Sequence, residues 1–164
     1  MDQVDRILEQ WNRERPDLDV TPMGTFGRLK RLADQLLREM ERVYQANDLT
    51  QAGFDVLATL RRSGPPHALT PSALISWTMV ASGTMTNRLD RLEARGLIER
   101  RTNPADGRGS VVALTDEGLA LIDRVVAEHV ANQHQLIAGL PPELRPHLDA
   151  ALRAWLASFE ERAG

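Results

Sequence analysis

The sequence predicts a mainly α-helical fold with one small β-hairpin, an α+β arrangement dominated by helices. Apolar residues recur at spacings of three and four along several long segments. Only two short runs have strand character, and a turn-rich stretch separates them. With 164 residues, 42% hydrophobic and 26% charged, the chain has the size and composition of one globular domain.

The first third of the chain predicts two helices. Asp2–Arg13 is a short amphipathic segment, and Pro16 and Pro22 bracket a linker after it. Gly24–Gln45 then forms a long helix with an apolar stripe. The apolar residues are Val4, Ile7, Leu8 and Trp11 in the first helix, and Leu29, Leu32, Ala33, Leu36, Leu37, Met40, Val43 and Tyr44 in the second.

Two further helices begin at threonine caps. Thr50 is suited to cap a helix that runs to about Arg62, and the sequence Gly64-Pro65-Pro66 ends that helix. Thr70 is followed by proline at the first helical position, which predicts a short helix over Pro71–Trp77.

The next helix has two chemically different faces. We expect it over Ser82–Arg95, with Gly96 as its C-terminal cap. Its inward stripe is Met85, Leu89 and Leu92, and the opposite side carries Thr84, Asn87, Arg88, Arg91 and Arg95. A cationic outer face of this kind, taken alone, is more often simply solvated.

The hairpin follows at once. Leu97–Arg101 and Val111–Leu114 are the predicted strands, and Asn103–Gly109 is too rich in turn residues to be anything but their loop. Thr115 caps a helix that extends to about Ala138, with Asp116 and Glu117 in its first turn. Pro141 and Pro142 start the last helix, whose apolar stripe is Leu144, Leu148, Leu152, Trp155, Leu156 and Phe159.

Composition excludes several classes of protein. The chain has no cysteine, so disulfides, thiol catalysis and cysteine zinc sites are ruled out. No run of about 18 apolar residues is present, so we expect no membrane partner. The first residues include Asp2, Asp5 and Glu9 rather than a basic and then apolar signal segment, which favours a cytoplasmic protein.

Catalytic and metal sites find little support. The four histidines, His67, His129, His134 and His147, are too scattered for a zinc site, and we expect them to be solvated or to face a partner. There is no nucleophile elbow and no phosphate-cradling glycine loop. We therefore expect no metal, no cofactor and no enzymatic activity.

The distribution of charge is more informative than the net value of −3. Residues 1–23 carry three basic and six acidic side chains, and residues 115–164 carry four and eight. Residues 24–114 carry thirteen basic and nine acidic side chains, so a basic segment lies between acidic ends. Such asymmetry is a weak indication of nucleic-acid binding.

The order of elements gives the stronger indication. A short helix, a tight link and a second helix with one polar, cationic face are what entry into the DNA major groove requires. The following hairpin offers a second contact, with Arg108 suited to the minor groove and Asp106 to holding the loop. The candidate DNA-binding residues are Ser82, Thr84, Thr86, Asn87, Arg88, Arg91, Asp106 and Arg108.

These residues also carry a resemblance. The segment SGTMTNRLDRLEARGLIERR, with the loop NPADGRGS and the run VVALTDEG, resembles the recognition helix, wing and following helix start of the MarR family. The resemblance implies a winged helix-turn-helix, a homodimer, and binding of double-stranded DNA at a pseudo-palindromic operator, with repression as the expected outcome. It also implies a single domain over 1–164, with dimerisation helices in 1–45 and 115–164 and a DNA-binding lobe over 50–114.

The extra N-terminal helix is similar to that of the urate-responsive and trans-aconitate-responsive branch of this family. The branch's ligand-binding residues match Trp11, Asp55, Arg88 and Arg100. The resemblance implies a small organic anion as effector, resembling urate, xanthine or aconitate, which releases the DNA. Ala73 departs from the branch, because the urate responders have there an acidic residue that pairs with the wing arginine.

The chemistry of this set suits a planar anion, but alternatives stay open. Arg88 offers a guanidinium, Asp55 accepts from a ring N–H, and Trp11 supplies an apolar lid. Asp55 and Arg88 equally suit a purely structural ion pair, and Trp11 suits ordinary packing. For the whole protein, the alternative is a winged-helix protein-interaction module without ligand control.

Overall fold

The computed structural model describes residues 1–78, 85–103 and 109–163. Its elements, in chain order, are α1 (Gln3–Glu14), α2 (Thr21–Ala46), α3 (Gln51–Arg62), β1 (Ala68–Leu69), α4 (Pro71–Trp77), α5 (Met85–Ala94), β2 (Ile98–Thr102), β3 (Ser110–Leu114), α6 (Asp116–Ile137), the 3-10 turn η2 (Pro142–Leu144) and α7 (Arg145–Ala163). The predicted fold class, mostly helical with a small sheet, is confirmed. No described helix has both the length and the apolar character needed to cross a membrane.

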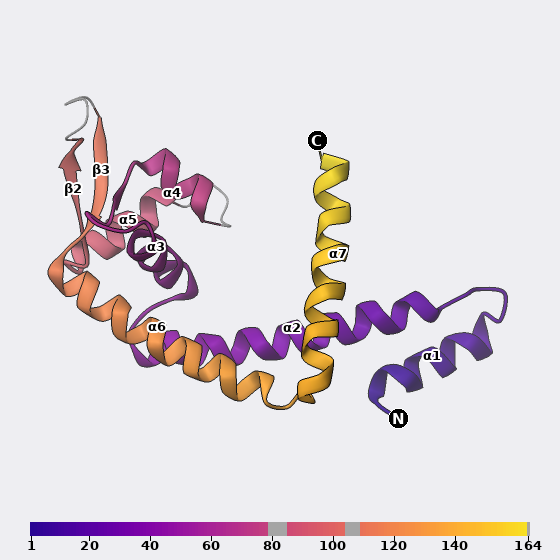
Figure 1. Cartoon of the computed structure of the whole chain (residues 1–164). Helices are drawn as coiled ribbons and strands as arrows, with labels where there is room; N and C mark the ends of the chain where they lie inside the picture. Colours follow the sequence, from indigo (N-terminus) through magenta and orange to yellow (C-terminus); the bar gives the residue numbers. More distant parts are fainter. Residues whose placement is uncertain (79–84, 104–108, 164) are drawn as a thin grey trace.

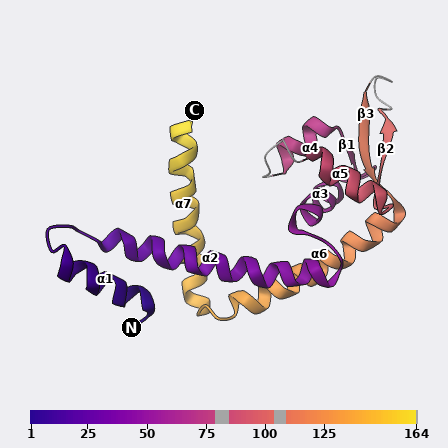
Figure 2. The same cartoon turned by 180° about the vertical axis from the view of Figure 1, so that it is seen from behind.

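A compact lobe lies at one end of two long helices (Figure 1). The lobe comprises α3 to β3, and α2 and α6 run away from it side by side. α1 lies against the far part of α2, and α7 rises away from the long helices (Figure 2). The main core lies in the lobe and where α2 and α6 meet it. Its fully buried side chains include Val56, Leu57, Leu60, Leu74, Ile98, Val112, Ile122 and Val125.

The helix starts follow local capping chemistry. Thr50, Thr70 and Thr115 each accept a hydrogen bond through the side-chain oxygen from a backbone N–H in the first turn of α3, α4 and α6. The three predicted starts are therefore confirmed. The start of α5 is described only from Met85, because the predicted first residues Ser82 and Thr84 lie outside the described residues.

Pro22 corrects one predicted boundary. It lies in the first turn of α2, which begins at Thr21, and not in a linker that ends before Gly24. The first turn tolerates proline because its backbone nitrogens have no partner within the helix. At the other end of the chain, Pro142 begins a 3-10 turn, and the last α-helix starts only at Arg145.

The sheet holds a strand that the sequence pattern did not predict. The strand order is β1-β3-β2, with both pairs antiparallel. β1 is two residues long and pairs Leu69 with Val112 of β3, so only a partner distant in the chain defines it. The predicted hairpin strands are confirmed as β2 and β3, shifted by one residue at their ends.

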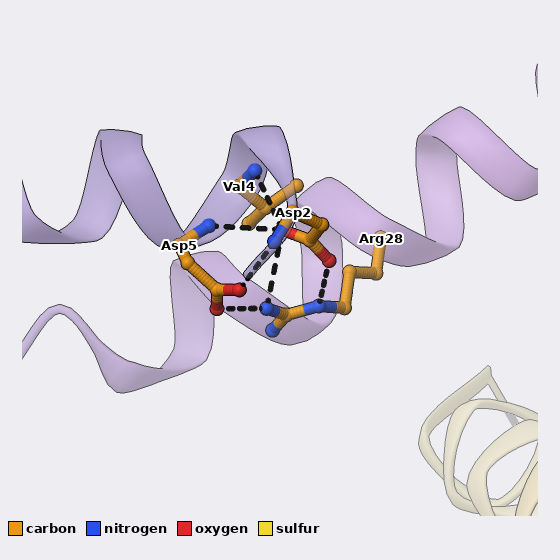
Figure 3. A network of polar contacts seen from close by, with 4 residues as sticks. All are labelled: Asp2, Val4, Asp5 and Arg28. Carbon is orange, nitrogen blue, oxygen red and sulfur yellow. Dashed lines mark hydrogen bonds and ion pairs between the residues drawn. The ribbon is translucent and has the colours of Figure 1, made fainter.

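The N-terminal helix is held to α2 by packing and by charge (Figure 3). Asp2 caps α1 by accepting from the backbone N–H of Val4 and Asp5, at 2.7 and 2.9 Å. Arg28 of α2 donates to the Asp2 carboxylate at 2.8 Å and also binds Asp5. The hydrogen bond from Arg28 is the main cause that lowers the pKa of Asp2 to about 2. One cation therefore clamps the first turn of α1.

Two glycines let α1 approach α2 closely. A Cβ added at Gly27 would lie 3.3 Å from a methyl of Val4, and one added at Gly24 would lie 3.1 Å from Leu8. Both distances are tighter than ordinary contacts, so side chains at these two positions would push α1 outward. Because Val4 lies at Gly27 and the later residue Leu8 lies at the earlier Gly24, the two helices run antiparallel, and the end of α1 lies near the beginning of α2.

Large apolar surfaces stay uncovered on α2 and α7. Phe26 meets Trp155 edge to face at a ring separation of 5.5 Å. Beyond that pair, a cavity of about 590 Å³ opens between α2, α6 and α7, lined by Leu32, Leu36, Met40, Leu136, Ile137 and Leu148 among others. Exposed large side chains on these helices include Phe26, Leu29, Leu32, Leu37, Leu152, Leu156 and Phe159.

Candidate nucleic-acid interface

The helix α5 divides into an inward and an outward face. Met85, Leu89 and Leu92 are buried in the core, as the apolar stripe predicts. Thr86, Asn87 and Arg91 are exposed, and Arg88 is half-buried. The outward face of α5 therefore offers hydroxyl, amide and guanidinium donors to solvent. Four further candidates, Ser82, Thr84, Asp106 and Arg108, lie outside the described residues.

Neighbouring elements hold α5 in place. Leu92 packs over the start of α3, where a Cβ at Gly53 would stand 3.6 Å from it. Beyond the end of α5, Arg95 donates to the backbone oxygen of Asp48 at 2.5 Å, which ties α5 to the turn between α2 and α3. Arg62 of α3 donates to the backbone oxygen of Trp77 at the end of α4. The helix that presents the polar face is therefore held by α3 and by the turn between α2 and α3, and α4 is in turn tied to α3.

The hairpin begins directly behind α5. Gly96 has a φ of +69°, a conformation that favours glycine and turns the chain out of the helix. Thr115 donates its hydroxyl to the Gly96 oxygen at 2.6 Å, so the far end of β3 is fastened to the same turn. The strands β2 and β3 then run together from Ile98–Leu114 to Thr102–Ser110. The base of the wing is thus rigidly placed beside α5.

Arg88 lines two cavities of different character. The larger, of about 670 Å³, has the cations Arg88, Arg91 and Arg95 around an apolar floor that includes Leu49 and Leu92. The smaller, of about 390 Å³, is lined by Glu41, Thr50, Gln51, Ala52, Asp55 and Arg88. Donors of α5 and a half-buried acidic group, Asp55, therefore share one region of the lobe.

Asp55 and Arg88 meet at the smaller cavity without bonding to one another. Burial raises the pKa of Asp55, and the positive charges of Arg88 and His129 oppose that rise. The Nη1 atom of Arg88 is buried and has no hydrogen-bond partner among the described residues. Among the described residues no ion pair joins Asp55 to Arg88, so the structure does not show the structural ion pair that the sequence left open.

The other two predicted ligand residues lie elsewhere. Trp11 is in α1, which contacts α2 at Gly24 and Gly27. Along α2, the rise from Gly27 to Tyr44 alone is roughly 25 Å, and α3, which carries Asp55, lies at that end of α2 (Figure 1). Arg100 lies in β2, where it binds Asp90 and Glu93 of α5. The structure brings together only Asp55 and Arg88 of the predicted set.

An aromatic cluster that the sequence did not reveal joins the lobe to the long helices. His129 of α6 is half-buried and packs within the chain, which the expectation of a solvated or partner-facing histidine did not include. Its ring lies 5.6 Å from Tyr44 of α2 and 4.9 Å from Phe54 of α3, and the Tyr44 hydroxyl is 3.2 Å from Nδ1. Burial lowers the pKa of His129 and raises that of Tyr44 to about 12. The one indication in the sequence was that Tyr44 and Phe54 recur with the apolar, inward-facing positions of their helices.

Comparison with known proteins agrees with this geometry. The model of the MarR family matches residues 47–109, which span the lobe from before α3 into the wing. The HTH-type transcriptional regulator PecS of Dickeya dadantii is 43% identical over 150 residues, covering 92% of this chain and 90% of PecS. The chain belongs to the MarR family.

Solved structures show the same fold. A mutant MarR from Escherichia coli, in complex with operator DNA, superposes with a TM-score of 0.69 at 27% identity, covering 89% of this chain and 97% of that one. BpsR of Bordetella bronchiseptica, whose DNA binding is regulated by 6-hydroxynicotinic acid, gives 0.66 at 28%, covering 77% and 89%. This MarR-family chain is thus a DNA-binding transcription regulator and not an enzyme.

Proposed function

We propose that this MarR-family regulator binds a pseudo-palindromic operator as a homodimer, acts as a repressor, and is released by a small organic anion. The outward face of α5 carries the proposal, because its polar and cationic side chains stand opposite a fully packed inner face. A helix that is buried on one side and carries donors on the other, followed by a wing in a family whose members bind DNA, is suited to the major groove.

The DNA contacts divide between helix and wing. Thr86, Asn87 and Arg91 are exposed on α5 and supply donors to base edges and phosphates. Arg88 belongs to the same helix and, through the smaller cavity, to the ligand site as well. The remaining contacts, Ser82 and Thr84 before α5 and Asp106 and Arg108 in the wing loop, are assigned from sequence.

A second copy of the chain is the proposed cover for the apolar faces of α2 and α7. Phe26, Leu156 and Phe159 are each more than half exposed, at 59%, 64% and 55%. Contiguous apolar surface of this kind is rare on monomers and typical of a subunit interface. We assign dimerisation to 1–45 and 115–164, and DNA binding to the lobe 50–114.

The ligand site is proposed around Asp55 and Arg88. An organic anion between them would satisfy the unpaired Nη1 of Arg88, and a ring N–H would pair with Asp55. Recruiting Arg88 to a ligand withdraws it from DNA. Trp11 can close this site only from the second copy, because α1 lies at the far end of its own α2. BpsR supports the principle, since an organic acid regulates its DNA binding.

DNA binding is tested by a mobility shift with a duplex from upstream of the protein's own gene. We expect tight binding that weakens steeply between about 50 and 200 mM salt, because several phosphates are neutralised. Arg91→Ala should weaken binding, and Arg153→Ala, which removes another exposed arginine from α7, should not. A protein that ignores the duplex at low salt would refute the proposal.

Ligand release is tested by titrating the protein–DNA complex with urate, xanthine and trans-aconitate. At least one anion should release the DNA, and Asp55→Asn should weaken that response while DNA binding persists. Asp123→Asn is the matched control, because its carboxylate pairs with Arg61 and lines neither cavity. Absence of release by all three anions would reject the effector and leave the DNA-binding role standing.

The dimer is tested by sedimentation at several protein concentrations. Leu156→Glu should shift the native protein from dimer to monomer, because it places a charge on the most exposed apolar position of α7. Glu160→Lys, a charge change near the end of the same helix at an exposed position, is the control. A native protein that sediments as a monomer throughout would contradict the assignment of a second copy.

A further inference from the structure

Arg100 lies in strand β2 of the wing, but its side chain contacts the proposed recognition helix α5. Its Nη2 atom donates to the Asp90 carboxylate at 2.6 Å, and its Nη1 atom binds Glu93. Its backbone N–H donates to Oε1 of Glu93 at 3.2 Å. The same residue pairs with Val112 in the β2–β3 ladder. One residue therefore joins the base of the wing to α5 through three hydrogen bonds.

The two carboxylates matter because of where they lie. Asp90 and Glu93 are three residues apart, so they are neighbours on the surface of α5. In number they match the two arginines of the described helix, Arg88 and Arg91. Unpaired, they would face the same polyanion as those arginines and repel its phosphates.

The arginine that pairs with them stays charged. Hydrogen bonding to Asp90, together with the negative charge of Glu93, raises the pKa of Arg100 above its ordinary value. Both nitrogens of its fork are engaged by these carboxylates, so the guanidinium is already committed. Its neighbour Arg101 points to the other face of β2 and binds Glu99 of the same strand.

We infer that Arg100 is a positioning residue for DNA binding, which neutralises the charges of Asp90 and Glu93 that would repel the phosphates and fixes the wing against α5. The inference rests on the proposed contact of the α5 face with DNA. It gives Arg100 a role that requires no effector and no contact with the operator. The acidic partners of Arg100 come from α5, whereas Ala73 of α4 offers no acidic group.

A double-mutant cycle tests this role by fluorescence anisotropy on the same upstream duplex. The four proteins are the native chain, Arg100→Ala, Asp90→Asn with Glu93→Gln, and the combination of all three changes. At about 50 mM salt, Arg100→Ala should weaken binding on the order of tenfold, and the loss should shrink at about 200 mM as the carboxylates are screened. In the neutralised background, Arg100→Ala should change binding by less than about twofold.

Each alternative predicts a different pattern. A loss of equal size in both backgrounds would mean that Arg100 touches DNA itself, and would overturn the inference. A loss that salt does not reduce would mean general loosening of the wing, and no loss at all would mean that the carboxylates need no neutralisation; both overturn it too. Arg101→Ala is the control, because its effect should be the same in both backgrounds.

Two further measurements keep the result interpretable. Unfolding midpoints of all variants are compared, and if Arg100→Ala lowers its midpoint, Arg100→Gln repeats the cycle with the side-chain length retained. Failure of the native protein to bind any duplex refutes the proposed function. By contrast, native binding with an additive cycle refutes only the role of Arg100.

Discussion

Replacing Gly118 with alanine tests how closely the wing is set against α6. A Cβ at Gly118 would lie 1.9 Å from the backbone oxygen of Leu97 and 2.8 Å from its carbonyl carbon. Side-chain Cβ atoms essentially never come within 3.0 Å of another atom, and here the atoms approached are backbone. The segment that leads into β2 must therefore withdraw from α6 by about 1 Å.

The expected cost follows from three contributions. Forcing a methyl group into a packed contact costs about 1–3 kcal/mol. The shift also weakens the hydrogen bond from the Thr115 N–H to the Leu97 oxygen, 3.2 Å long, which contributes about 1 kcal/mol. Alanine returns about 1 kcal/mol through its higher helix propensity. The net loss in free energy of unfolding is about 1–3 kcal/mol.

Gly53 provides a matched control. It is the third residue of α3, as Gly118 is of α6, and each donates its N–H to a capping threonine, at 3.1 Å to Thr50 and 3.0 Å to Thr115. A Cβ at Gly53, however, meets nothing closer than 3.5 Å. Gly53→Ala should therefore stabilise the protein by about 0.4–1 kcal/mol.

Urea unfolding followed by far-UV circular dichroism measures both variants. All proteins are compared at one concentration, because the stability of a dimer depends on it. Gly118→Ala should lower the midpoint and Gly53→Ala should raise it, with little change in the slope. A Gly118→Ala protein as stable as the native chain, or one that shifts in the same direction as Gly53→Ala, would refute the close approach of Leu97 to α6.

Three other predictions concern the core, the aromatic junction and α1. Leu74 is fully buried in α4, so Leu74→Ala should cost about 2–5 kcal/mol in urea unfolding, and a loss below about 1 kcal/mol would contradict its packing. Burial depresses the pKa of His129 below 6.5 in the folded state, so the unfolded state binds more protons and stability falls as the pH drops through that value. His129→Gln should therefore flatten the profile of unfolding free energy against pH below 6.5. Superimposable profiles of the native and variant proteins would count against burial of the ring. The pKa of Asp2 is lowered from 3.8 to about 2, so its ion pair with Arg28 contributes fully above pH 3.8 and is lost as the pH falls towards 2. At neutral pH, Asp2→Asn should speed amide hydrogen exchange in α1 but not in α3. Unchanged exchange in α1 would show that this ion pair does not hold the helix.

Most of the helices were predictable because their signals are local. A threonine followed by a helical apolar repeat defines a start within one turn, and Thr50, Thr70 and Thr115 all cap as expected. The two faces of α5 followed from spacing alone, since Leu89 and Leu92 recur with the helical period. The family resemblance rested on the same contiguous segment, and comparison confirmed the family.

The contacts between distant segments were not predictable in this way. β1 is a strand because Leu69 pairs with Val112 of β3, and a segment of two residues is too short to show a strand pattern in the sequence. The packing of His129 was not predicted, because Tyr44 and Phe54, which lie against its ring, come from two other helices. The partners of Arg100 depend on how β2 turns back along α5, which spacing does not encode.

By itself, the sequence determined the helices, the hairpin and which face of α5 is polar, because capping and periodicity act within a few residues of the chain. The tertiary structure alone decided which side chains meet across the fold. It placed Asp55 beside Arg88, left Trp11 at the far end of α2, and turned Arg100 onto α5. Such meetings are set by how helices and strands pack in three dimensions, over separations in the chain that no local pattern spans.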